Sequence, residues 1–206
     1  MSSNSFNTFS KSISRCETLV SDYKQLQKMH AADNSIPAPK DMVRGAVVLA
    51  IAALDAYVTN VFAEKLVPYL KKHRPGDQLV NLLHEAGLDT REALTLINME
   101  RPYRRIRTLI SRHYAKYTTQ KFDVIDSIFL PYGIKNISDN AAAKTEKQTI
   151  KTSVGKLIER RHEIAHSGDY NSHNRLKQID EDQIEKRIKH LELLVRNMDD
   201  IICNRI

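Results

Sequence analysis

One apolar stretch, residues 41–66, restricts the possible folds of this chain more than any other part of its sequence. The middle of the stretch is apolar nearly all round when it is drawn as a helix. Such a helix has no face to offer to water and has to be surrounded by other parts of the protein. Asp41 is a favourable N-cap for it. The sequence therefore predicts a buried central helix over about residues 41–66.

The other segments are predicted to be helices as well. The 206 residues include only 6 Gly and 6 Pro, which are too few for the many turns of a β-sandwich or barrel. Apolar residues recur every three or four positions over residues 1–32 and again from about residue 180. Residues 138–147 are polar, and we expect a surface connection there. These patterns predict one all-α domain over residues 1–206, a helical bundle of about five to seven helices.

Charge and cysteine usage limit the classes of partner and compartment. The formal net charge of +7 favours a polyanionic partner without specifying which one. Cys16 and Cys203 form no C-x-x-C pair, which argues against a structural zinc site and a disulfide framework. Residues 1–5 lack the features of a signal peptide, and the longest apolar run, residues 46–54, is too short to span a bilayer. We therefore expect a cytoplasmic protein without membrane contact.

The most basic segment is residues 101–117, the second half of a helix predicted over residues 90–117 with a break or kink at Pro102. Arginine binds phosphate and tyrosine stacks on bases, so this segment is a candidate RNA-binding surface. A solvated helix face that holds no ligand would show the same pattern. The candidate RNA-binding residues are Arg101, Arg104, Arg105, Arg112 and Lys116.

The densest group of chemically reactive side chains lies in residues 160–169, RRHEIAHSGD, at the end of a helix predicted over about residues 153–166. Gly168 is typical of the residue that follows a helix. Arg161 falls in the middle of the apolar stripe, where a guanidinium needs a carboxylate, a cleft or a subunit interface. Asp55 of the central helix is the carboxylate that we nominate. At about 100° per residue, His166 lies roughly 140° from Arg161. We therefore expect the two to converge only if the helix end unwinds or a second subunit completes the site.

Two chemistries fit this segment. Residues 162–166 match H-E-x-x-H, in which two histidines bind zinc and Glu163 acts as the base. This is the pattern of zinc proteases, and Glu185 lies where one branch of these enzymes has its third zinc ligand. The longer zinc pattern fails, since Asp169 and Ser172 replace its Gly and third His, and a helix that stops at His166 would leave the last turn unsound. Arg161 to His166 equally matches R-x4-H, the pattern of metal-free ribonucleases.

The second pattern extends into a family resemblance. Residues 160–169 resemble the R-x4-6-H motif of HEPN domains (higher eukaryotes and prokaryotes nucleotide-binding). Residues 43–48 and 53–58 resemble the early core helix of the RiboL-PSP branch of these domains. The resemblance covers about residues 40–205, preceded by an N-terminal helix over residues 1–32. It implies a HEPN-like bundle that is usually dimeric and is either a metal-independent endoribonuclease without a cofactor or a close RNA-binding relative.

On the ribonuclease hypothesis, each reactive side chain has an expected role. His166 moves a proton at neutral pH, Arg161 stabilises the phosphate, and His162 assists. Asp55, Glu163 and Arg160 are expected to support them. One histidine cannot easily be both base and acid, so we expect a homodimer with a composite active site, and RNA cut at a 2′-OH.

The biological setting and two alternative functions stay open at this stage. The protein would suit a toxin or a phage-defence effector that an antitoxin or another defence partner restrains. The alternatives are a non-catalytic HEPN module that binds RNA or protein, and a zinc metallohydrolase that uses His162, Glu163 and His166.

Overall fold

The computed structural model describes residues 2–33, 39–115, 121–145 and 149–206 of the chain. It confirms the all-α prediction, with 79% of the chain in helices. Within the described ranges there are nine α-helices and one short 3-10 helix, and the only β pairing is an isolated bridge between Tyr170 and Leu176. The elements are α1 (Asn4–Asp33), α2 (Asp41–Lys72), α3 (Asp77–Glu85), α4 (Thr90–Ile97), α5 (Pro102–Tyr114), α6 (Phe122–Phe129), η1 (Leu130–Tyr132), α7 (Ile137–Ala143), α8 (Ile150–Ser167) and α9 (Glu181–Arg205).

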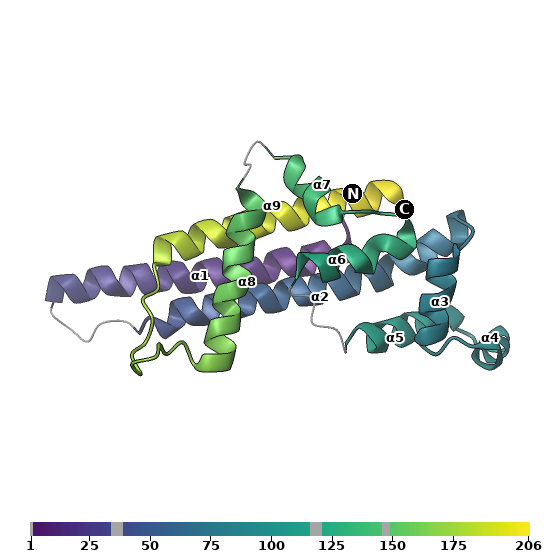
Figure 1. Cartoon of the computed structure of the whole chain (residues 1–206), viewed down its shortest axis with the longest axis horizontal. Coiled ribbons are helices and arrows are strands. Elements are labelled where there is room, and N and C mark those ends of the chain that lie inside the picture. The colour runs from purple at the N-terminus through teal and green to yellow at the C-terminus, as the bar shows by residue number, and fades with distance from the viewer. Residues whose placement is uncertain (1, 34–38, 116–120, 146–148) are drawn as a thin grey trace.

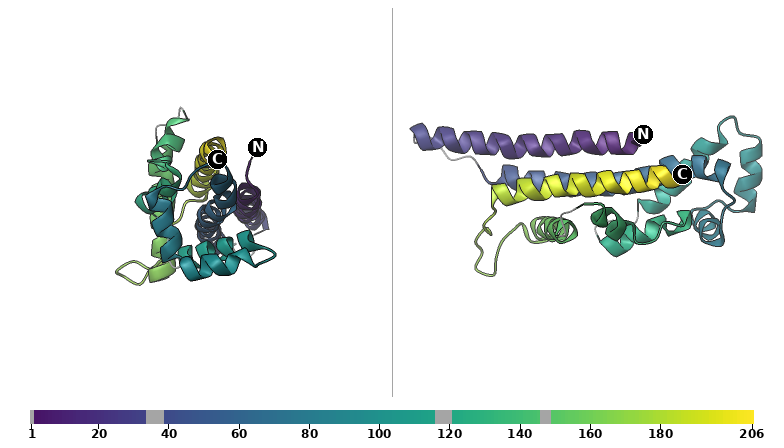
Figure 2. Two further views of the ribbon diagram at one scale, coloured as in Figure 1. Left: turned by 90° about the vertical axis from the view of Figure 1, so that its right-hand side faces the viewer. Right: turned by 90° about the horizontal axis from the view of Figure 1, so that it is seen from above.

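Three long helices form the body of the molecule. α1, α2 and α9 run along its long axis and pack against one another (Figures 1 and 2). α8 lies across them in Figure 1 and contacts both α2 and α9. α3, α4 and α5 gather at one end of the long axis. α8 therefore packs on two of the three long helices that form the body of the fold.

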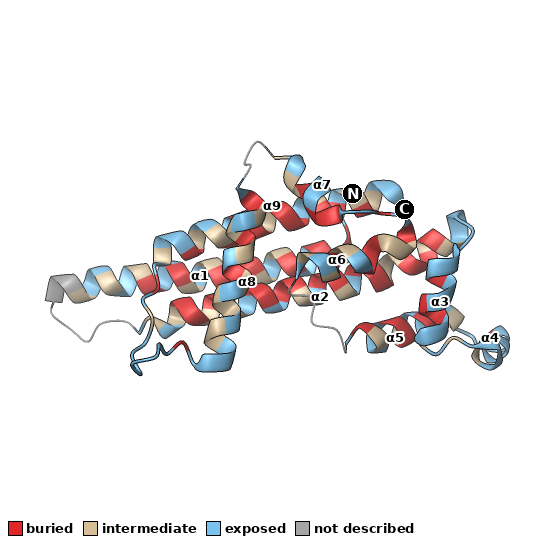
Figure 3. Cartoon of the chain, viewed as in Figure 1, coloured by how far each residue is buried: buried red, intermediate tan, exposed pale blue. Residues whose placement is uncertain are grey.

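The predicted central helix is confirmed as α2, and its buried residues run along most of its length (Figure 3). It extends to Lys72, beyond the predicted end near residue 66, and includes Pro68. By length and composition alone, α2 is apolar enough to cross a membrane. However, 61% of its most apolar window is buried inside the bundle, which is the situation of a core helix that is covered by other helices.

The helix count of the described residues exceeds the predicted five to seven because one predicted segment holds two helices and another helix was missed. Of the break or kink predicted at Pro102, the structure has a break: α4 ends at Ile97 and Pro102 begins α5, since proline is well tolerated in a first turn. Residues 138–147 are not simply a polar connection, because α7 occupies the first part. Its Ser138 is fully buried and donates from its backbone N and its Oγ to the Asp126 carboxylate, at 2.8 and 2.9 Å.

Candidate active site

The motif helix lies where the sequence predicts it and is slightly longer. α8 starts at Ile150 and ends at Ser167, so His166 belongs to its last regular turn. Gly168 follows with a φ of 59°, the left-handed conformation that commonly ends a helix. The expectation that the helix stops at His166 is therefore wrong by one residue. Ile150, Val154 and Leu157 form the buried side of α8. Arg161 continues this side and is partly buried, whereas His162 and His166 are exposed.

Arg161, His162 and His166 line one open cleft between α8 and the start of α6, with a volume of about 1120 Å³. The two histidine rings lie on successive turns with their centroids 4.3 Å apart, and both histidines are exposed, whereas Arg161 is partly buried. Arg161 and His166 therefore reach one cleft without unwinding of the helix end, and completion of the site by a second subunit stays a prediction.

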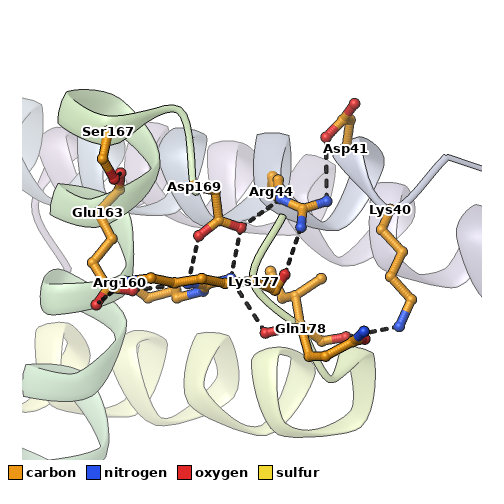
Figure 4. A network of polar contacts seen from close by, with 10 residues as sticks. Lys40, Asp41, Arg44, Arg160, Glu163, Ser167, Asp169, Lys177 and Gln178 are labelled. Atoms are coloured by element: carbon orange, nitrogen blue, oxygen red, sulfur yellow. Dashed lines mark hydrogen bonds and ion pairs between the residues drawn. The ribbon is translucent and has the colours of Figure 1, made fainter. Parts of the chain in front are cut away.

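The end of α8 is fixed by a buried carboxylate that the sequence interpretation treated only as part of a helix stop. Asp169 is fully buried and has a φ of 65°, a conformation that aspartate adopts more readily than most residues. Its Oδ2 accepts hydrogen bonds from Nε of Arg44 and from Nη2 of Arg160, both at 2.6 Å (Figure 4). Its Oδ1 lies 2.5 Å from Nη1 of Arg160. Two guanidinium groups therefore compensate for the burial of this one carboxylate.

Each arginine of this network also binds a second segment. Arg44, in the first turn of α2, donates to the backbone oxygen of Lys177 at 2.8 Å and to Asp41 at 3.3 Å. Arg160 donates to Glu163 at 2.8 Å and to the backbone oxygen of Gln178 at 3.3 Å. The network joins the start of α2, the end of α8 and the segment that leads to α9 (Figure 4). Arg160 acts on the site through these contacts, and Arg161 is the arginine that lines the cleft.

Glu163 is held as an anion. Its carboxylate lies 2.9 Å from Nζ of Lys177 on one side and accepts from Arg160 on the other. Hydrogen bonds from Lys177 and Arg160 lower its pKa below the ordinary glutamate value. A general base works best with a pKa near the working pH, so this environment suits a supporting anion better than the proton acceptor that the zinc hypothesis requires.

Glu185, the third zinc ligand on the zinc hypothesis, forms ion pairs with two lysines. The carboxylate oxygens of Glu185 lie 2.5 Å from Lys24 and 2.5 Å from Lys189, and hydrogen bonds from Lys189 and Lys24 lower its pKa to about 2. Within the described ranges, no three His, Cys, Asp or Glu residues gather closely enough to hold a metal ion. His162 and His166 thus lack the third protein ligand that a zinc site needs.

Asp55 and those predicted RNA-binding residues that the structure describes are not among the residues that line the cleft between α8 and α6. Asp55 is a partly buried residue of α2, the helix on which α8 packs, and its pairing with Arg161 stays a prediction. Arg101, Arg104 and Arg105 line a separate shallow cleft at the start of α5, where Arg105 binds Glu92 at 2.6 Å. Arg112 is exposed further along α5. Lys116 lies outside the described residues.

A family model of RiboL-PSP-HEPN domains matches residues 10–204, nearly the whole chain. The chain belongs to the RiboL-PSP-HEPN family. The match confirms the resemblance seen in the sequence and reaches further, since it begins within α1. Searches of curated proteins and of solved structures found no match. Membership of a HEPN family points to a ribonuclease or an RNA-binding module.

Proposed function

We propose that this RiboL-PSP-HEPN protein is a metal-independent endoribonuclease that cuts RNA by attack of a 2′-OH on the adjacent phosphate. The observation that carries the proposal is the shared cleft of Arg161, His162 and His166. This reaction needs a cationic group to bind the phosphate and imidazoles to transfer protons, and the RNA needs open access to them. The buried carboxylate of Asp169 supports the proposal further, because it fixes the helix end from which His166 projects.

In the proposed reaction, His166 takes the proton of the 2′-OH and the 2′-oxygen attacks phosphorus. Arg161 binds the non-bridging oxygens and stabilises the extra negative charge of the pentavalent state. The bond from phosphorus to the 5′-oxygen then breaks, and an imidazolium protonates that oxygen. In the homodimer proposed below, the second copy supplies this imidazolium, and His162, whose ring lies beside that of His166, assists. The products are a 2′,3′-cyclic phosphate and a 5′-OH.

We further propose a cytoplasmic homodimer without membrane contact, in which two clefts form a composite active site. A homodimer would bring a second His162 and His166 pair to the same RNA and so supply base and acid from different copies. A toxin or phage-defence role, restrained by an antitoxin or another partner, is part of the same proposal. Light scattering of the purified protein tests the dimer: a monomer at assay concentrations that still cuts RNA would exclude a composite site.

The decisive experiment is a cleavage assay in EDTA with RNA and with DNA of the same sequence. We expect cleavage of RNA alone, with 2′,3′-cyclic phosphate ends. His166→Ala and Arg161→Ala should abolish it, and His162→Ala should weaken it. His84→Ala, which removes an exposed histidine of α3, is the control and should cut like wild type. Activity that disappears in EDTA and returns with Zn²⁺ would instead support the zinc hydrolase.

The cationic cleft at the start of α5 favours a second candidate function, a non-catalytic module that binds RNA. Arg101, Arg104 and Arg105 line this cleft, which includes none of the α8 residues. On this hypothesis the protein binds RNA there and the R-x4-H residues have no chemical task. Wild type and His166→Ala would then bind RNA equally, and neither would cut it.

A further inference from the structure

The cleft that contains Arg161 and His166 has a second wall, which the proposed reaction does not use. This wall combines the side chains of three apolar residues, two lysines and one aspartate: Phe122, Val124, Ile158, Lys121, Lys151 and Asp123. Phe122 and Ile158 pack against the hydrophobic core with one side and remain partly exposed toward the cleft with the other. A cleft with apolar surface beside cationic groups has the two properties that a nucleotide needs, because a base is flat and apolar and a phosphate is an anion.

Gly155 keeps this wall open. A Cβ atom added there would lie 3.9 Å from Cε2 of Phe122, an ordinary contact distance. Close packing therefore does not require a glycine at this position. A glycine inside a helix costs about 0.5–1 kcal/mol relative to alanine, so its presence does not help α8 to form either. What the missing side chain provides is free space beside the Phe122 ring, within the cleft.

Lys151 brings a positive charge to the same place. Its Nζ lies 5.2 Å from the centroid of the Phe122 ring and 2.5 Å from the Asp139 carboxylate of α7. The Asp139 side chain is 62% exposed, so water and salt weaken the pair. The phosphodiester of an RNA chain carries one negative charge, as an aspartate does, and offers two non-bridging oxygens, so it can compete for this ammonium group.

We propose that Phe122, Gly155 and Lys151 form a nucleotide subsite of the active cleft. The base of a nucleotide next to the scissile phosphate packs on the Phe122 ring in the space beside Gly155, and Lys151 contacts a flanking phosphate. The inference rests on the RNA cleavage proposed above and assigns one part of the substrate to named residues. It also explains why the cleft is far larger than one phosphate group requires.

The first test uses tryptophan fluorescence. The chain contains no Trp, so Phe122→Trp introduces a single reporter at the proposed stacking position. A short 2′-O-methyl RNA, which lacks the free 2′-OH and is not cut, is added to this variant. Base stacking should quench the emission with the same concentration dependence as binding measured by anisotropy of the labelled oligonucleotide. Met29→Trp, at an exposed position of α1, is the matched control and should stay unquenched. Binding without quenching at position 122 would overturn the proposal.

The second test compares affinities for the same oligonucleotide. Phe122→Leu keeps an apolar side chain against the core and removes the flat ring, and Lys151→Gln removes the charge. Phe122→Leu should weaken binding at least about fivefold, the lower end of base–aromatic stacking, and Lys151→Gln should also weaken it. Asp139→Asn should strengthen binding, since it releases Lys151 from its only carboxylate partner among the described residues. Thermal melts show whether each variant is folded.

The results separate the subsite from the nuclease activity. If wild type cuts RNA and all three variants bind like wild type, the subsite is overturned and the nuclease function stands. If the variants change affinity as expected but wild type never cuts RNA, the subsite stands as a binding site and the nuclease function is overturned. If wild type does not bind the oligonucleotide, the subsite is overturned.

Discussion

Nε of Arg44 donates a 2.6 Å hydrogen bond to the buried carboxylate of Asp169, and this contact ties the first turn of the central helix to the end of the motif helix. The two residues are 125 positions apart in the sequence. Because Arg160 binds the same carboxylate, the orientation of the last turn of α8, and with it His166, depends on one charge in the protein interior.

Replacing Asp169 by asparagine should destabilise the protein strongly. Asparagine has nearly the same shape, but it removes the buried anion that two guanidinium groups share. Arg44 and Arg160 then keep only their more exposed carboxylate partners, Asp41 and Glu163. Loss of one partner of a buried ion pair costs about 3–5 kcal/mol, and urea unfolding should show a decrease of that size. Asp41→Asn is the matched control, since Asp41 also binds Arg44 but is exposed, and it should change stability by less than about 1 kcal/mol. Equal effects of the two substitutions would contradict the assigned role of Asp169.

The neighbouring arginines 160 and 161 should separate stability from activity. Arg161→Gln removes the proposed phosphate ligand and should lower kcat about 10²- to 10³-fold, as the loss of one oxyanion-stabilising group does. Arg160→Gln removes charged hydrogen bonds to Asp169 and Glu163 and should lower the unfolding free energy by about 2 kcal/mol. Cleavage rates measured well below the melting temperature, together with urea unfolding, distinguish the two. A similar loss of stability in both variants would mean that Arg161 is a structural residue too.

Local sequence signals were sufficient to predict the helices that build the core. Asp41 was wrongly predicted as the N-cap of α2, a position that Lys40 occupies. The central helix over residues 41–66 follows from its long apolar stretch alone, and the motif helix from its apolar stripe and Gly168. Both predictions depend on neighbouring residues only, and both are confirmed as α2 and α8. α7 was missed because it is short and is held by packing on α9 and α6, including the hydrogen bonds from Ser138 to Asp126, which nothing in its own sequence indicates.

The partner choices within the site could not be predicted in the same way. Arg44 and Asp55 both interrupt the apolar surface of α2. From the sequence alone, either of them could be the residue that pairs with a charged side chain of the motif segment. The way that α8 crosses α2 decides that Arg44 meets Asp169, and this crossing is a property of the whole bundle. A charged residue in the first turn of a buried helix, together with an aspartate directly after a helix-ending glycine, is a signal that could have indicated the pair.

The ion pairs of Glu185 give a pH dependence of defined sign. Hydrogen bonds from Lys189 and Lys24 lower its pKa from the ordinary glutamate value of 4.5, expected for the unfolded chain, to about 2 in the folded protein. A depressed pKa stabilises the folded state above the unfolded value, and this stabilisation is lost as pH falls toward the folded value. The stability difference between wild type and Glu185→Gln should therefore be largest above about pH 5 and should shrink between about pH 4.5 and pH 2. Urea unfolding at several pH values measures it, with the exposed Asp200→Asn as the control. A difference that grows on acidification would have the wrong sign.

Charge reversal at the start of α5 should weaken RNA binding more at Arg104 than at Arg105. Both arginines line the same shallow cleft. Arg105 already binds Glu92 at 2.6 Å, so less of its charge than of the Arg104 charge is available to a phosphate. Arg104→Glu should lower the affinity for RNA in low salt, and the loss should diminish as salt is raised, because each phosphate contact removed lowers the slope of log K against log salt by about one. Anisotropy titrations at several salt concentrations measure both quantities, and Lys11→Glu, at an exposed position of α1, controls for net charge. If Arg104→Glu and Lys11→Glu behave alike, the segment is only a solvated face, and the RNA contacts have to lie in the α8 cleft.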